Sequence, residues 1–179
     1  MRIISGSHKG ILINPPKGLP VRPTTDRAKE SLFNILSLHF NLEECTVLDL
    51  FSGTGNIAYE CCSRGSERVV AVDINFKCCE FIKEMKVKYR LNGLEIQKRD
   101  AYIFLKGCTE TFDLIFADAP YAQKELVQIP ELVLSHKLLK PGGWLIVEHE
   151  SNLEMTGQSG FFDKRTYGQS AFTFFCEPV

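Results

Sequence analysis

Short apolar segments alternate with helical patterns along this 179-residue chain, and this alternation restricts the fold more than any other feature. The strand-like segments are 46–51, 68–73, 95–99, 113–117 and 144–148, and helical patterns at 57–64 and 75–90 follow the first two. Repeated strand–helix–strand units require a largely parallel sheet with helices on both faces. We therefore expect an α/β fold in one domain spanning 1–179, for which 44% hydrophobic residues suffice to build a core.

Both ends of the chain depart from this alternation. Near the C-terminus, 161–167 and 171–176 are strand-like and close together, which predicts an antiparallel hairpin. Near the N-terminus, two short apolar segments flank a turn with glycines at 6 and 10, which predicts a small β-hairpin. The sequence therefore predicts a mostly parallel, seven-stranded sheet with a C-terminal antiparallel hairpin and a small N-terminal β-hairpin extension.

A further helix is expected between the N-terminal hairpin and the first parallel strand. Thr25 or Asp26 can cap its N-terminus, and apolar residues recur with helical spacing to about Leu38. Gly65 and Gly93 follow the next two helical patterns, where we expect a positive φ at each.

Charge is spread unevenly along the chain. Residues 1–30 contain six basic and two acidic side chains, although the whole chain has a net charge of −1. A solvated basic face has such a composition, and so does a localised region that contacts phosphates. We divide the chain into 1–25, the hairpin with a basic loop, and 26–179, the α/β body.

Cysteine usage and hydropathy indicate a cytoplasmic protein without a membrane partner. The seven cysteines include two adjacent pairs and no C-x-x-C spacing, so we expect reduced, buried side chains and no metal. The four histidines show no spacing that suggests a metal site either. No stretch approaches the roughly 18 apolar residues of a membrane span, and the first residues lack a secretory signal.

A glycine-containing loop after the strand at 46–51 predicts a cofactor site. Gly53 and Gly55 allow the backbone to turn tightly and approach a ligand, and Asp73 ends the next strand, where it can bind ribose hydroxyls. Together with Ala58, these residues also satisfy the G-x-G-x-x-G/A pattern. An NAD-dependent oxidoreductase therefore fits them about as well as any other nucleoside-binding enzyme.

Asp49, at the start of this loop, helps to distinguish a dinucleotide-binding enzyme from one that binds another nucleoside cofactor. A carboxylate here would repel the pyrophosphate of a dinucleotide. It would attract the ammonium and sulfonium groups of S-adenosylmethionine. Asp49 therefore favours that cofactor, although it could also do no more than accept hydrogen bonds from loop amides.

The segment 118–121, which follows the apolar strand at 113–117, reads Asp-Ala-Pro-Tyr. It resembles the (Asp/Asn)-Pro-Pro-(Tyr/Phe) motif of amino-group methyltransferases. An exocyclic base amine is a poor nucleophile until its N–H protons are held out of plane, which Asp118 and a nearby carbonyl can do. Tyr121 would stack on the target base.

Nearly the whole chain resembles the RsmD family, bacterial methyltransferases that modify guanine N2 in small-subunit ribosomal RNA. The most specific likeness is the block Arg22-Pro23-Thr24-Thr25-Asp26-Arg27, which generic methyltransferases lack. The resemblance implies a Rossmann-like methyltransferase fold and S-adenosyl-L-methionine as cofactor. It also implies a partner, either ribosomal RNA or an assembly intermediate of the small ribosomal subunit, and we expect a monomer.

The resemblance also implies roles for individual residues. The cofactor would be bound by Asp49, Phe51, Gly53, Thr54, Gly55, Asp73, Ile74, Asp100 and Ala101. The catalytic loop would comprise Asp118, Ala119, Pro120 and Tyr121. RNA would be contacted by Arg2, Lys9, Arg22, Thr24 and Arg27.

Ala119 departs from the family pattern, which has a proline at this position. Asp118 then no longer precedes a proline and is held less rigidly, so activity could be weakened or lost. Three alternatives to guanine-N2 methylation remain open on the sequence. They are methylation of adenine N6 or of a protein glutamine, an NAD-dependent oxidoreductase, and an RNA-binding module without catalysis.

Overall fold

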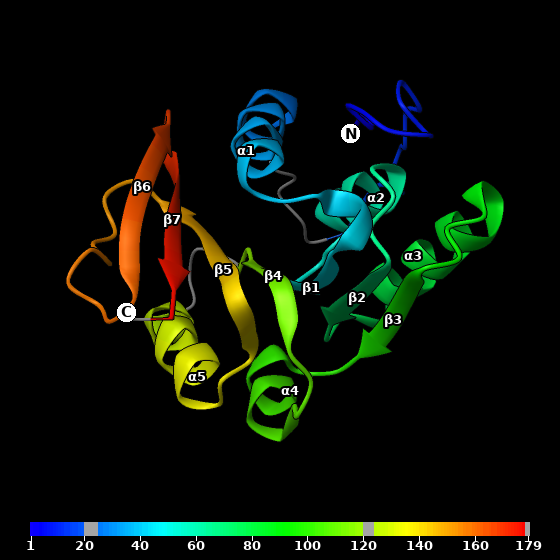
Figure 1. The fold of residues 1–179 in the computed structure, drawn as a ribbon. Coiled ribbons are helices and arrows are strands. Elements are labelled where there is room, and N and C mark those ends of the chain that lie inside the picture. The colour runs from blue at the N-terminus through cyan, green and yellow to red at the C-terminus, as the bar shows by residue number, and fades with distance from the viewer. Residues whose placement is uncertain (20–24, 120–123, 178–179) are drawn as a thin grey trace.

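The structure, a computed structural model, describes residues 1–19, 25–119 and 124–177. At its centre is a seven-stranded sheet with the order β3-β2-β1-β4-β5-β7-β6 (Figure 1). The strands are β1 (Thr46–Leu50), β2 (Arg68–Asp73), β3 (Leu94–Lys98), β4 (Phe112–Ala117), β5 (Leu139–Glu150), β6 (Phe161–Tyr167) and β7 (Ser170–Cys176). The helices are α1 (Asp26–His39), η1 (Leu42–Glu44), α2 (Asn56–Ser63), α3 (Phe76–Tyr89), α4 (Ala101–Gly107), η2 (Lys124–Gln128) and α5 (Ile129–Ser135).

The strand directions confirm the predicted architecture. The first five strands pair in parallel, whereas β7 is antiparallel to both β5 and β6. The sequence pattern missed α4 and α5, and it placed the start of β5 five residues late, at 144 instead of Leu139.

Helices cover both faces of the sheet, which explains why its central strands are almost continuously apolar. Successive strand residues point to opposite faces, so Val47 and Leu114 lie in one buried cluster and Leu48 and Ile115 in the other. The first cluster includes residues of α1, α2 and α3, and the second includes residues of α4 and α5 (Figure 1).

The predictions for the ends of the helices are confirmed at Thr25 and Gly65 and are wrong at Gly93. The Thr25 hydroxyl caps α1 by accepting a hydrogen bond from Ala28 N at 3.2 Å, and Gly65 has φ +93°. The expectation for Gly93 was wrong, because α3 ends earlier and Arg90 takes the left-handed conformation with φ +54°. A side chain at 93 would approach the Glu67 carbonyl oxygen to 3.0 Å, so packing favours glycine there.

The N-terminal arms pair as predicted but form less regular structure than two strands. Ile3 N donates to Ile11 O at 3.0 Å and Gly10 N donates to Ile3 O at 2.9 Å. Arg2 and Leu12 form the one β-bridge found in this part of the described chain.

A buried ionic cluster fixes this N-terminal segment to the body. The ammonium of Lys29, 1% exposed, donates to Arg2 O at 2.6 Å and to Asn56 Oδ1 at 2.8 Å, and it lies 3.4 Å from Glu60 Oε2. The Glu60 carboxylate also accepts hydrogen bonds from Ile4 N, Ser5 N and Arg64 Nε, at 2.8, 3.0 and 2.8 Å. One buried ion pair therefore joins α1, α2 and the first residues of the chain.

The seven thiols are all free, as expected; four of them are buried, whereas Cys62, Cys108 and Cys176 are partly exposed. Burial raises the pKa of Cys62 to about 12 and that of Cys45 to about 11, so neither thiol is activated as a nucleophile. Among the described residues, no helix is both long enough and apolar enough to cross a membrane.

Candidate cofactor and substrate site

The carboxyl ends of β2, β1 and β4 meet at one edge of the sheet. Leu50, the last residue of β1, pairs with Val72 on one side and Ala117 on the other. Asp73 and Asp118 therefore flank the loop that follows Leu50. Ligands of open α/β sheets bind at such an edge.

The loop after β1 is held in a tight, left-handed path. Phe51, Gly53 and Gly55 have φ values of +56°, +54° and +84°. The Ser52 hydroxyl donates to Asp49 O at 2.6 Å, which closes the turn. A Cβ on Gly55 would lie 2.6 Å from the Tyr59 ring, so the loop has room for glycine alone at this position.

Asp73 connects the end of β2 to the glycine loop. Its Oδ2 accepts a hydrogen bond from Gly53 N at 2.8 Å, and its Oδ1 accepts one from Asn75 N at 2.7 Å. Burial raises the pKa of Asp73, and both hydrogen bonds oppose that rise. Because each carboxylate oxygen can accept a second hydrogen bond, Asp73 can also bind ribose hydroxyls.

Asp49 is a buried carboxyl directly beneath the loop. It is 3% exposed, and its Oδ2 accepts a hydrogen bond from Ala58 N at 3.2 Å. Burial raises its pKa to about 7, with a further contribution from the charge of Asp73. A carboxyl in this position gains a partner from a cationic ligand and repels a pyrophosphate, so these residues fit S-adenosylmethionine better than a dinucleotide.

Exposed apolar side chains at the same edge can border a flat ring. Ile74, predicted to bind the cofactor, is 66% exposed, and Ile103, in the first turn of α4, is 58% exposed. Asp100 caps α4 by accepting a hydrogen bond from Ile103 N at 2.9 Å, which places Ala101 at the first position of that helix. The sequence pattern missed Ile103, because exposure of an apolar residue cannot be read from spacing.

The segment predicted to be catalytic begins where β4 ends. Asp118 N lies 3.5 Å from Leu50 O, and Asp118 is partly exposed whereas Ala119 is buried. Pro120 and Tyr121 lie outside the described residues. Phe33 of α1 stacks on Phe116 with ring centroids 6.2 Å apart, so α1 packs against the end of β4, just before this segment.

The residues predicted to contact RNA do not all come together. Arg2 forms a long ion pair with Asp26 at 3.9 Å, one residue before Arg27, so these two arginines lie close to each other. Lys9 belongs to a turn packed on the other end of α2, where Ser7 N donates to Ser63 O at 2.7 Å. Arg22 and Thr24 lie outside the described residues.

The sequence pattern missed three residues that position the site, Lys29, Asn56 and Glu60. Asn56 follows the glycine loop directly, and Lys29 binds its side chain from α1. One signal was present, because Lys29 lies on the same helical face as Leu32 and Leu36, where a charge needs a buried partner. Within the described residues, no group of three His, Cys, Asp or Glu side chains could hold a metal ion.

Comparison with known proteins identifies the family. The family model described as "Conserved hypothetical protein 95" matches residues 1–176. YlbH of Bacillus subtilis, named as a candidate rRNA methyltransferase, is 33% identical over 175 residues, which cover 94% of each chain. Ribosomal RNA small subunit methyltransferase D of Haemophilus influenzae is 30% identical over 156 residues, covering 85% of this chain and 80% of the relative.

A solved structure agrees in fold along the whole length. The hypothetical protein TTHA0928 of Thermus thermophilus superimposes with a TM-score of 0.85 at 26% identity, covering 98% of both chains. The glycine loop, Asp73 and Asp118 occupy one edge of a Rossmann-like methyltransferase sheet, and the family match spans nearly all of the sequence. The chain therefore belongs to the RsmD family of methyltransferases.

Proposed function

We propose that this protein transfers a methyl group from S-adenosylmethionine to the exocyclic N2 amine of a guanine in small-subunit ribosomal RNA. One observation carries the proposal. A buried carboxyl, Asp49, lies beneath the glycine loop, and Asp73 and Asp118 lie at the ends of the two strands that flank it. A cofactor site and a polar group for the acceptor are thus adjacent. The names of the relatives support the RNA substrate.

The cofactor, when bound, supplies a methyl group on a sulfonium centre. Asp49 and the loop at Gly53 and Gly55 would hold its methionine part, Asp73 its ribose, and Ile74 with Ala101 would border its adenine. Asp49 and Ala119 are buried at this edge, so these two positions are shielded from water. A site with less water strengthens each electrostatic contact to the reacting groups.

Asp118 acts on the acceptor amine. Its carboxylate accepts a hydrogen bond from an N–H of the amine, which directs the nitrogen lone pair out of the plane of the base. The nitrogen would become positive as its new bond to the methyl carbon replaced that carbon's bond to sulfur, and the hydrogen bond to Asp118 would strengthen. The surplus proton then leaves the nitrogen to a water molecule or to Asp118. Stabilisation that grows toward the transition state raises kcat.

The proposed function is tested with small ribosomal subunits that lack the modification. The protein is incubated with them and with radiolabelled S-adenosylmethionine, and the RNA is digested to nucleosides for mass spectrometry. We expect one methyl group per subunit, recovered as N2-methylguanosine. Recovery as N6-methyladenosine, or label in protein and none in RNA, would assign a different acceptor.

The pKa of Asp49 predicts a pH dependence of cofactor binding. In the free protein the carboxyl ionises near pH 7, and the cationic ligand binds better to the ionised form. Affinity for S-adenosylhomocysteine, which retains the ammonium, should therefore rise up to about tenfold per pH unit below pH 7 and level off above it. Isothermal titration calorimetry measures this and also detects the released proton. In Asp49→Asn the rise should disappear; a wild-type affinity that is constant from acid to neutral pH would contradict the prediction.

A further inference from the structure

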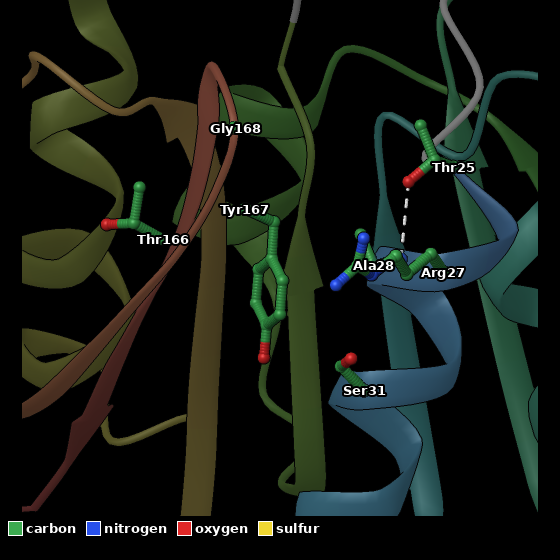
Figure 2. A pocket seen from close by; sticks show the side chains of 7 residues that line it. All are labelled: Thr25, Arg27, Ala28, Ser31, Thr166, Tyr167 and Gly168. Atoms are coloured by element: carbon green, nitrogen blue, oxygen red, sulfur yellow. Dashed lines mark hydrogen bonds between the residues drawn. The ribbon is translucent and has the colours of Figure 1, made fainter.

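A pocket lies between α1 and the C-terminal hairpin. It has a volume of about 390 Å³ and separates the first turns of α1 from the turn between β6 and β7. Figure 2 shows the residues that line it, which are Thr25, Arg27, Ala28, Ser31, Thr166, Tyr167 and Gly168. None of them belongs to the glycine loop or to the segment at Asp118, so a ligand here contacts different groups.

The pocket opens at the same edge of the sheet as the cofactor loop. Ser170, which begins β7, pairs with Glu150 at the end of β5, and β5 runs parallel to β4. The β6–β7 turn therefore lies at the edge where Asp118 follows β4. The α1 wall is connected to the same site, because Lys29 binds Asn56 directly after the glycine loop.

The distance across the sheet separates the pocket from the target base. β4 is followed by β5, β7 and β6 in the sheet, and neighbouring strands are about 4.8 Å apart. The hairpin wall of the pocket therefore lies on the order of 10–14 Å from β4. A base held by Asp118 cannot fill it, whereas a neighbouring nucleotide of the same strand can.

The side chains combine an aromatic ring, a cation and hydroxyls. Tyr167 is half-buried, and its ring contacts Phe172 edge to face at 5.6 Å, which fixes its position. Figure 2 shows the Arg27 guanidinium extending from α1 toward the Tyr167 ring, with the Ser31 hydroxyl on the same side of the helix. Arg27 is exposed, and no carboxylate of the described residues forms an ion pair with it.

We propose that this pocket binds an RNA nucleotide adjacent to the target guanine, with its base against Tyr167 and its phosphate on Arg27. Aromatic rings bind unpaired bases by stacking, and arginine binds phosphate through paired N–H donors. Ser31 can donate a further hydrogen bond to the phosphate. The inference rests on the proposed function. It adds a substrate contact from outside the basic N-terminal residues 1–30, since Tyr167 comes from the C-terminal hairpin.

The experiment measures RNA binding and methyl transfer separately. Binding of a short, fluorescently labelled single-stranded RNA is followed by anisotropy at several salt concentrations. We expect Tyr167→Ala to raise Kd roughly 5- to 150-fold, because one stacked base is lost, and Tyr167→Phe to bind like wild type. Arg27→Ala should lower the slope of log affinity against log salt by about 0.7, the contribution of one phosphate contact.

Two control variants separate this pocket from general surface effects. Phe162→Ala removes an exposed aromatic from the opposite end of β6, and Lys106→Ala removes an exposed charge from α4 on the other face of the sheet. Both should bind the RNA like wild type. With small ribosomal subunits as substrate, Tyr167→Ala should raise KM and leave kcat and the affinity for S-adenosylhomocysteine unchanged.

The outcomes distinguish the two proposals. Wild-type Kd and salt slope in both Tyr167→Ala and Arg27→Ala would overturn the pocket assignment, even if the wild type methylates RNA. A loss of transfer to intact subunits, with unchanged binding and methylation of protein-free RNA, would assign the pocket to a ribosomal protein and also overturn it. If the wild type methylates no RNA, the proposed function fails, and the binding data still decide the pocket.

Discussion

Asp118→Ala is expected to lower kcat by roughly 10²–10⁴-fold, the usual contribution of a positioned acid–base group. The carboxylate follows β4 directly, and its loss removes the acceptor that localises the lone pair of the amine. Affinity for S-adenosylhomocysteine should not change, because Asp49 and Asp73 remain. Single-turnover methyl transfer to small ribosomal subunits, together with calorimetry of cofactor binding, measures both quantities.

Asp118→Asn is the matched control. Its amide oxygen can still accept one N–H bond, and asparagine occupies this position in part of the motif that the segment resembles. It should therefore retain more activity than Asp118→Ala. If the alanine variant loses cofactor affinity as strongly as activity, Asp118 supports the cofactor site and does not act on the amine.

Lys29→Met is expected to lower the free energy of unfolding by about 3–5 kcal/mol, the cost of breaking a buried ion pair by removing one partner. The Glu60 carboxylate, at 0% exposure, would lose its buried lysine partner and keep only the ion pair with Arg64. Urea denaturation followed by circular dichroism measures the change. Lys83→Met, which removes an exposed pair with Glu80, should leave the free energy of unfolding nearly unchanged.

The double variant Lys29→Met with Glu60→Leu tests the same pair by another route. Removing both charges eliminates the buried carboxylate that has lost its lysine partner, so this variant should unfold at a higher urea concentration than Lys29→Met alone. An equal or lower stability would show that the backbone hydrogen bonds to Glu60 from Ile4 and Ser5 contribute more than the ion pair.

The sheet could be predicted from sequence because its strands are buried on both faces. Val47 to Leu50 is buried throughout and apolar except for Asp49, and Leu114 to Ala117 is a continuous apolar run that Asp118 follows. The short helices could not be predicted, since α4 and α5 have seven residues each and an apolar segment of that length is also consistent with a buried strand. The early start of β5 was hidden by Pro141 and Gly142, the latter with φ +78°, which indicate a turn.

The candidate cofactor site could be predicted from local order along the chain, whereas the contacts of Lys29 and the position of Tyr167 could not. Asp49, the glycines and Asp73 come from two consecutive strand ends, so their meeting follows from parallel topology. Lys29 and Glu60 are 31 positions apart, and Arg27 and Tyr167 come from opposite ends of the chain. Contacts of that kind depend on how helices and hairpins pack, which no local pattern encodes.

The C-terminal hairpin has a consequence for self-association. Its strand β7 pairs with β5 from Trp144 to Glu150 and so satisfies backbone groups that would otherwise form a long open ladder. The outer strand, β6, carries Asp163, Lys164 and Arg165 in succession. Charges on an outermost strand discourage intermolecular β-pairing and aggregation. A chain cut before residue 161 would lose this protection and expose the apolar β5 as a template for amyloid-like or domain-swapped pairing.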